Sequence, residues 1–305
     1  MNCSCGGNAI YFRRYEGRYY CKNCFINQIE KRFLKTVSEN SLIGKGEKIA
    51  VGVSGGKDSS TLLYLMKKFF GDIDISAISV DEGISGYRDE SIRKAEEFCK
   101  SISVEHHTVS FKDKLGFRLD DIKTDNFCTH CGVFRRYLLN KKARELGADK
   151  MAVAHNMDDE VQSILMNIFR GDLSKFRRLG AKPPSVGDEK LLPRIKPLRD
   201  IPEKEVKLYA ILNSIPYYDG ECPHSLNNVR RDVQKIINDT EERYAGTKHQ
   251  IISFYDKISP AIGSGIPIQK VLDRCKICGE AATGGICRAC QLVENITGKV
   301  KGIAE

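Results

Sequence analysis

No run of about 18 apolar residues occurs in the sequence, so a membrane-spanning helix is not expected. The first residues, Met1-Asn2-Cys3-Ser4-Cys5-Gly6, contain no apolar signal region. The low apolar content of a disordered chain is also missing, since hydrophobic residues make up 41% of the 305 positions. We therefore expect a cytoplasmic, soluble protein with no membrane partner. The chain is long enough for one large core or two modest domains.

Acidic residues are outnumbered by basic ones, 40 against 49, which gives a formal net charge of +9. The sequence also contains twelve cysteines. In a reducing compartment, cysteines this dense indicate metal binding or catalysis rather than disulfides.

Eight of the cysteines form two sets of four, one at each end of the chain. The C-terminal set has the spacing C-x2-C-x8-C-x2-C, which is typical of a tetrahedral zinc site. The N-terminal set is similar, but its first pair is only one residue apart. Because both segments have few apolar residues and all four ligands come from protein, we expect two structural zinc ions rather than unmetallated thiols. The predicted ligands are Cys3, Cys5, Cys21, Cys24, Cys275, Cys278, Cys287 and Cys290.

The central region alternates strand and helix patterns, which predicts an α/β fold with a doubly wound parallel sheet. Strands are expected at 48–53, 73–80, 104–111 and 150–154, and helices at about 60–66, 89–100, 132–146 and 158–169. In such sheets, ligands bind at the carboxyl ends of the strands. We divide the chain into an N-terminal zinc module (1–30), a central domain (31–225), a helical extension (226–270) and a C-terminal zinc ribbon (271–305).

The turn after the first strand reads Ser-Gly-Gly-Lys-Asp-Ser, at positions 54 to 59. It is not a Walker A loop, because Asp rather than Ser or Thr follows the lysine, and the dinucleotide G-x-G-x-x-G pattern is absent. The hexapeptide resembles the pyrophosphate loop of the PP-loop ATPases, which cut ATP between its α- and β-phosphates. That resemblance implies that the β- and γ-phosphates contact Ser54, Gly55, Gly56, Lys57 and Ser59, and that Asp58 faces Mg²⁺. The alternative is a glycine-rich turn without a ligand.

Two further segments follow predicted strands. By the same resemblance, Val80 and Asp81 lie where the adenosine of ATP binds, and Ala154–Glu160 matches the A-H-N-x-D-D pattern of the family. Asp158 and Asp159 can hold Mg²⁺ or orient the substrate, or they can cap the next helix. We expect one to cap and the other, favouring Asp159, to act, while His155 is either structural or functional.

Three cysteines lie between the terminal sets in a different pattern, Cys128, Cys131 and Cys222. Three thiolate ligands suit a [4Fe–4S] cluster with one open iron, and Cys-Pro after a distant pair is typical of iron–sulfur ligands. A persulfide pair, or a third zinc with His130 or His224, is the alternative. Cys99 is expected to be a buried apolar residue.

Taken together, the terminal zinc modules, the Ser-Gly-Gly-Lys-Asp-Ser loop, the pattern C-x-x-C-G-x-x-R-R from Cys128 and the later G-E-C-P around Cys222 are similar to those of the tRNA 2-thiouridine synthetases. This is the group with TtuA, NcsA and the eukaryotic cytosolic tRNA thiolases. The closely spaced Cys3 and Cys5 depart from that pattern. The resemblance implies ATP-dependent replacement of a tRNA uridine C2 oxygen by sulfur. Arg135 and Arg136 would steady the α-phosphate or the developing negative charge. The alternative, above all for Arg136, is a basic patch that faces tRNA or solvent.

The resemblance leaves several points open. Uridine 34 is favoured over ribothymidine 54, because thiolation at 54 accompanies thermophily and the many Asn residues disfavour a hyperthermophile. The sulfur donor is either sulfide or a ubiquitin-like thiocarboxylate carrier, and a homodimer is compatible with the family. Other functions that fit the motifs are an adenylating enzyme with a different substrate and a non-catalytic zinc-bearing RNA-binding protein.

Basic clusters predict contacts with tRNA. The first lies beside Tyr11, Tyr15, Tyr19 and Tyr20 in the N-terminal module. The clustered residues are Arg13, Arg14 and Arg18, then Arg170, Lys175, Arg177 and Arg178, and finally Lys141, Lys142 and Arg144. We also expect a loop at 183–187 that orders on binding, and further helix over 226–254.

Overall fold

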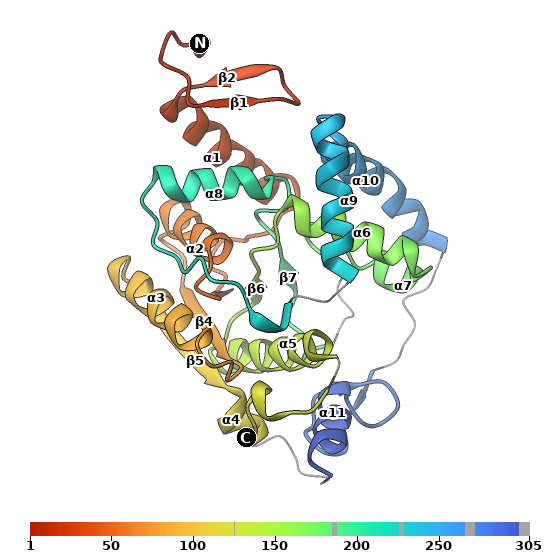
Figure 1. Ribbon diagram of the computed structural model, residues 1–305. Helices are drawn as coiled ribbons and strands as arrows, with labels where there is room; N and C mark the ends of the chain where they lie inside the picture. Colours follow the sequence, from red (N-terminus) through yellow and green to blue (C-terminus); the bar gives the residue numbers. More distant parts are fainter. Residues whose placement is uncertain (125, 185–187, 226–228, 266–271, 299–305) are drawn as a thin grey trace.

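The computed structural model describes residues 1–124, 126–184, 188–225, 229–265 and 272–298 (Figure 1). Its centre is a five-stranded sheet in the order β5-β4-β3-β6-β7, with all neighbouring strands parallel. The strands are β3 (Ile49–Gly52), β4 (Ile75–Asp81), β5 (Glu105–Ser110), β6 (Lys150–Ala152) and β7 (Arg194–Ile195). The predicted α/β doubly wound fold is therefore confirmed, and β7 is an additional strand. The strand order reverses between β3 and β6, where ligands bind in such sheets.

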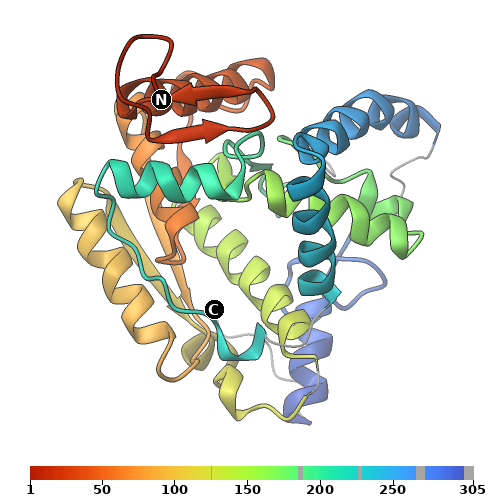
Figure 2. The same ribbon diagram turned by 45° about the horizontal axis from the view of Figure 1, so that its top comes forward.

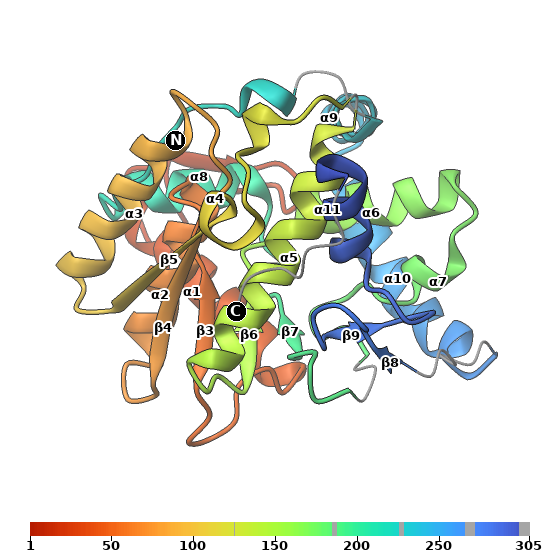
Figure 3. The same ribbon diagram turned by 90° about the horizontal axis from the view of Figure 1, so that it is seen from below.

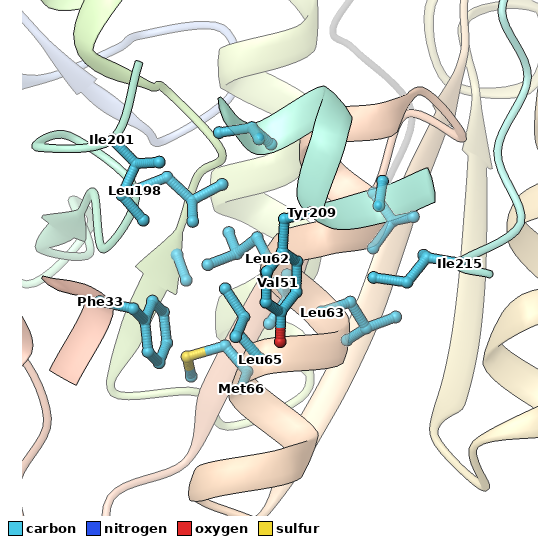
Figure 4. Close-up of a cluster of buried hydrophobic side chains, with 14 of the residues drawn as sticks. Phe33, Val51, Leu62, Leu63, Leu65, Met66, Leu198, Ile201, Tyr209 and Ile215 are labelled. Atoms are coloured by element: carbon cyan, nitrogen blue, oxygen red, sulfur yellow. The ribbon is translucent and has the colours of Figure 1, made fainter. Parts of the chain in front are cut away.

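Alternate residues of the strands pack against helices on the two faces of the sheet. Val51 belongs to a core shared with α1 (Lys22–Glu39), α2 (Lys57–Phe69), α3 (Arg88–Ser101) and α8 (Glu203–Leu212) (Figure 4). Ala50 faces the opposite core, formed with α4 (Phe111–Leu115), α5 (Phe127–Glu145) and α11 (Arg288–Thr297). Cys99 is buried in the first core, as expected of an apolar residue.

Several elements have different bounds from those predicted. Helix α5 begins at Phe127 rather than at 132, so it contains both cysteines of the C-x-x-C pair. Strand β5 ends at Ser110, whose hydroxyl accepts a hydrogen bond from the Asp113 amide and caps α4. The helix predicted over 226–254 is two helices, α9 (Val229–Arg243) and α10 (Thr247–Gly265), which are separated at Gly246, and 226–228 lie outside the described residues.

Helices α9 and α10 pack beside α6 (Met157–Phe169) and α7 (Leu173–Phe176) at one side of the sheet (Figure 1). The N-terminal hairpin of β1 (Tyr11–Arg13) and β2 (Arg18–Tyr20) lies beside α1 and α8 (Figure 2). The C-terminal module of β8 (Asp273–Arg274), β9 (Ala281–Ala282) and α11 lies beside α5 (Figure 3). The division into four domains stays a prediction, and α1 is continuous across its first boundary. Among the described helices, none has the length and apolarity needed to cross a bilayer.

Candidate active site

The Ser-Gly-Gly-Lys-Asp-Ser loop connects β3 to α2 at the point where the strand order reverses. Gly55 has φ +83°, and a Cβ there would lie 2.0 Å from the Ser91 carbonyl oxygen, so only glycine fits. The Ser59 hydroxyl accepts from the Ser54 amide at 3.1 Å and donates to the Gly56 carbonyl at 3.0 Å. No side chain caps the start of α2. Its first amides can therefore receive an anion.

Lys57 is held beside this loop by carboxylates. Its Nζ lies 2.7 Å from Glu203 Oε1 and 3.0 Å from Asp58 Oδ2. Burial opposes the charge, but Asp58 and Glu203 together raise the pKa of Lys57. Burial also raises the pKa of Asp58 to about 6, although Lys57 acts in the opposite direction. Lys57 is thus a charged donor whose present partners an incoming phosphate can replace.

The two aspartates after β6 make different contacts. Asn156 and Asp159 cap α6 reciprocally, each accepting from the other's amide at 3.2 Å. The other Asp159 oxygen accepts from Arg230 at 2.9 Å. Asp158 is buried, accepts from the Glu203 amide at 2.8 Å and pairs with Lys248. Asp159 therefore caps the helix, whereas the favoured expectation gave the capping role to Asp158. The role of Asp159 in the reaction stays a prediction.

A cavity of about 290 Å³ is lined by both aspartates, Asp58 and Glu203. Burial raises the pKa of Asp159, with Arg230 opposing it. Carboxylates from three elements thus face one space beside Lys57, which is the chemistry that Mg²⁺ binding requires.

A second pocket of about 300 Å³ extends from the loop across the sheet edge to α5. Val80 lines this pocket, while the carboxylate of Asp81 accepts a hydrogen bond from the Gly83 amide at 2.8 Å. His155 is exposed at the rim. The loop, the end of β4 and α5 thus form three walls, and the residues that line them include Ser54, Asp58, Ser59, Glu82, Arg88, Arg135, Arg136 and Arg194.

The sequence motifs do not include Glu82 and Arg88, which hold this pocket together. Arg88 Nε lies 2.7 Å from Glu82 Oε2, and Arg88 also donates to the Ser54 carbonyl at 2.9 Å. Arg135 Nε is 3.7 Å from the other Glu82 oxygen. A charged residue directly after a strand was the only available sequence signal.

The three central cysteines gather beside this pocket, since Cys131 directly precedes Gly132 of its lining and interacts electrostatically with Cys128 and Cys222. Cys128 and Cys131 lie on the first two turns of α5, and Cys222 lies in the loop before a short helix, η2 (Pro223–Ser225). Cys128 Sγ donates to the His224 carbonyl at 3.5 Å. Burial, with Glu82, Cys222 and Cys128 adding to it and Arg135 opposing it, raises the pKa of Cys131 to about 11. Burial likewise raises the pKa of Cys222. The three thiols therefore share one environment.

The donor set fits a cluster better than a zinc ion. With Zn–S bonds of about 2.3 Å, the ligands of a tetrahedral zinc lie about 3.8 Å apart. Within the described part of the chain, only the two terminal cysteine sets bring their ligand atoms within 4.8 Å of one another. His224 Nε2 is engaged by Asp120 Oδ1 at 2.9 Å, and His130 Nδ1 by the Asn126 carbonyl at 2.9 Å. Three separated thiolates suit the corners of an iron–sulfur cluster.

Comparison with known proteins agrees with this geometry. A family model described as a PP-loop domain matches residues 26–240. The tRNA 2-thiolation protein NcsA of Haloferax volcanii is 37% identical over 323 residues, with 97% of this chain and 99% of that protein covered. The chain belongs to the PP-loop tRNA 2-thiolation family.

Two further members of the PP-loop tRNA 2-thiolation family are informative. The solved U34-tRNA thiolase NcsA from Methanococcus maripaludis, with its [4Fe-4S] cluster, has a TM-score of 0.85 and 37% identity, with 100% of this chain and 98% of that chain covered. The tRNA-5-methyluridine(54) 2-sulfurtransferase of Pyrococcus horikoshii is 33% identical over 293 residues, with 95% of this chain and 93% of that protein covered. The family thus contains enzymes named for either uridine.

The terminal cysteine sets of this PP-loop protein each form one compact group that can hold a metal ion. Cys5 Sγ lies 3.5 Å from Cys21 Sγ, and Cys278 Sγ lies 3.6 Å from Cys287 Sγ. These separations are close to those of ligands on one tetrahedral ion. The close spacing of Cys3 and Cys5 therefore does not prevent the N-terminal thiols from converging.

The expected RNA contact of Arg13 is wrong. Arg13 is fully buried and binds Glu205 of α8 through Nε at 2.9 Å and Nη2 at 2.7 Å. Tyr15 donates to the same carboxylate at 2.9 Å. These side chains attach the hairpin to α8, whereas Arg14 and Arg18 are exposed. Similarly, Arg144 pairs with Glu280 and attaches the C-terminal module to α5. Of the loop expected at 183–187, positions 185–187 lie outside the described residues.

Proposed function

We propose that this protein is an ATP-dependent tRNA sulfurtransferase that replaces the C2 oxygen of a uridine by sulfur. The observation that supports this most strongly is the position of Cys128, Cys131 and Cys222 beside the PP-loop pocket. An activated oxygen and a sulfur source can then meet at one carbon atom. The identity of more than a third to NcsA proteins along nearly the whole chain supports the same reaction.

In this proposal the PP-loop holds ATP. Ser54, Gly55, Gly56 and Ser59 shape the cradle, and the first amides of α2 receive the β- and γ-phosphates. Lys57 exchanges Glu203 and Asp58 for the phosphates. Mg²⁺ is held at the carboxylates of Asp58 and Asp159, with Asp158 fixing the elements around them. Val80, Asp81 and His155 border the place of the nucleoside.

Adenylation makes the uridine oxygen a leaving group. The C2 oxygen attacks the α-phosphorus, the bond to the bridging oxygen of the β-phosphate breaks, and pyrophosphate departs. A sulfur nucleophile then adds at C2, and the C2–O bond breaks, so that AMP carries away the original oxygen. Arg135, held near the pocket by Glu82, stabilises the negative charge that develops in both steps.

The three central thiolates are proposed to hold a [4Fe–4S] cluster, and the NcsA structure that resembles this chain contains one. When bound through three cysteines, such a cluster offers one open iron for hydrosulfide. In the alternative persulfide route, Cys128 or Cys222 carries the sulfur. The eight terminal cysteines are proposed to hold two structural zinc ions.

Uridine 34 is the proposed target, because the U34 thiolase is more similar (37% identity) than the position-54 enzyme (33% identity). The alternative is ribothymidine 54. The proposed sulfur donor is sulfide or a ubiquitin-like thiocarboxylate carrier, the proposed assembly includes a homodimer, and the proposed location is the cytoplasm.

Anaerobically reconstituted protein tests the proposal with ATP, Mg²⁺, sulfide and tRNA from a thiolation-deficient cell. Digestion and mass spectrometry should find one sulfur at uridine 34, accompanied by AMP. The variant Cys222→Ala should bind ATP normally and transfer no sulfur. Cys99→Ala is the matched control, because Cys99 is a buried core residue of α3 that belongs to none of the cysteine motifs. Sulfur transfer by Cys222→Ala would contradict both the cluster and the persulfide routes.

A further inference from the structure

A third cavity of about 690 Å³ lies between α5, α7, β7 and the C-terminal module, and we call it the basic cavity. The pocket of about 300 Å³ beside the PP-loop is called the nucleotide pocket below. The two spaces adjoin, because both are lined by Arg136, Val153, His155 and Arg194. The cations that line the basic cavity are Arg136, Lys175, Arg178, Arg194 and Lys196. Of these five cations, only Lys175 and Arg178 belong to one of the basic clusters predicted from the sequence.

The charges of this cavity are not balanced by protein. Lys175 and Lys196 are paired with Asp172 at 2.7 Å and Glu160 at 2.5 Å. The single acidic residue of the described lining, Glu280, is paired with Arg144. Within the described ranges, no carboxylate lies within 4.0 Å of the other three guanidiniums, those of Arg136, Arg178 and Arg194. Three elements thus present unpaired positive charge to one space.

Two of these cations are also close together. Arg194 Nη2 donates to the carbonyl oxygen of Arg136 at 3.3 Å. Burial, with the charge of Arg136 adding to it, lowers the pKa of Arg194 to about 10. Neighbouring like charges without a counter-ion are unfavourable, and an anion in the cavity relieves that cost.

The remaining wall is apolar and includes Leu179, Pro183 and Leu192. A surface of guanidiniums beside apolar side chains matches single-stranded RNA, in which phosphates alternate with exposed bases. A free nucleotide offers the same phosphate chemistry, but the PP-loop already provides amides and Lys57 for triphosphate. RNA is therefore the ligand that the cavity fits better.

We propose that the basic cavity binds the phosphodiesters that flank the target uridine, so that the base enters the nucleotide pocket between Arg136 and His155. This inference rests on the proposed function and specifies where its RNA substrate enters. Arg178, which lines only the basic cavity, then contacts RNA without touching ATP.

The test compares Arg178→Gln and Arg194→Gln with Arg243→Gln in the reconstituted protein. Arg243 is exposed at the end of α9, so its substitution removes the same charge elsewhere. Fluorescence anisotropy with labelled tRNA should show binding weakened about tenfold by each cavity substitution and unchanged by the control. The slope of log Kobs against the logarithm of the salt concentration is negative, and it should become less steep by about 0.7 for each arginine removed. The KM for tRNA in the thiolation assay should rise, and the affinity of Arg178→Gln for ATP should not change.

Three outcomes are distinct. If wild-type protein thiolates tRNA and both cavity variants match Arg243→Gln, the inference is overturned and the proposed function stands. If Arg178→Gln loses ATP affinity but keeps tRNA affinity, the cavity serves the nucleotide and the inference is again overturned. If wild-type protein transfers no sulfur while tRNA binding still depends on Arg178 and Arg194, the RNA site stands and the proposed function fails.

Discussion

Replacing Arg13 by methionine removes the cation from a buried ion pair that joins the N-terminal hairpin to α8. The side chains of Arg13 and Glu205 are both 0% exposed. Methionine has a similar reach and leaves Glu205 as a buried carboxylate that has lost two charged donors. Breaking one side of such a pair costs about 3–5 kcal/mol. Because Tyr15 and Arg32 remain 2.9 Å and 3.7 Å from Glu205, we expect a loss of about 3 kcal/mol.

Substituting Glu205 as well as Arg13 distinguishes the loss of the ion-pair attraction from the cost of leaving the Glu205 carboxylate buried and unpaired. In Arg13→Met with Glu205→Leu, both charges are replaced by apolar groups, and stability should return to within about 1 kcal/mol of wild type. The matched control is Arg14→Met, which changes the exposed neighbour on the same hairpin and should cost less than about 0.5 kcal/mol. Urea unfolding of zinc-loaded protein, followed by circular dichroism, measures all four free energies. A loss below about 1 kcal/mol for Arg13→Met would refute the assignment of Arg13 to module docking.

Three further perturbations address the candidate site. Gly55→Ala places a Cβ against the Ser91 carbonyl and should weaken ATP binding, measured by calorimetry, at least tenfold. The control Gly171→Ala also lies at positive φ, but its added Cβ has no atom within 4 Å, so ATP affinity should not change. Equal affinities of the two variants would contradict the loop assignment. Because burial raises the pKa of Asp58 to about 6, its carboxylate is mostly charged above that pH, and the rate of AMP formation should rise as the pH passes 6. Asp58→Asn should form AMP slowly and without this rise. A rise near pH 6 that persists in Asp58→Asn would show that another group titrates. The His224 ring stacks on the Phe127 ring with centroids 4.2 Å apart, and its Nε2 lies 2.9 Å from Asp120 Oδ1. His224→Ala should therefore release the Cys222 loop and halve the iron bound per chain after reconstitution, whereas His130→Ala should retain the full iron content. Full iron in His224→Ala would show that these two contacts are dispensable.

The sheet and the PP-loop were predictable because their signals are local. Short apolar strands followed by helix patterns specify a parallel sheet without knowledge of distant contacts. The sequence Gly55-Gly56 before a helix has a direct steric reason, which the contact with Ser91 explains. The convergence of the terminal cysteines was likewise contained in their spacing.

Arg13 shows what local patterns cannot provide. An arginine among tyrosines has the same local sequence whether it faces RNA or a buried carboxylate. Its partner, Glu205, is 192 residues away, and only the tertiary fold brings the two together. The three unpaired arginines of the basic cavity have the same origin, because Arg136, Arg178 and Arg194 come from separate elements.

The start of α5 was misplaced for a different reason. The helix was predicted to begin at Gly132, which lies directly after the C-x-x-C pair. In the fold, Gly132 is buried within α5, and the helix extends back to Phe127. This extension fixes Cys128 and Cys131 on consecutive turns, which gives the candidate cluster site two of its three ligands on one rigid element.

The central claim is that this protein activates the C2 oxygen of a tRNA uridine by adenylation, and isotope tracing tests it most directly. A tRNA transcript with ¹⁸O at C2 of the target uridine is incubated anaerobically with reconstituted protein, ATP, Mg²⁺ and sulfide, and the AMP is analysed by mass spectrometry. The account predicts one ¹⁸O in AMP for each sulfur gained by the tRNA. Release of the label as water, with AMP unlabelled, would contradict it.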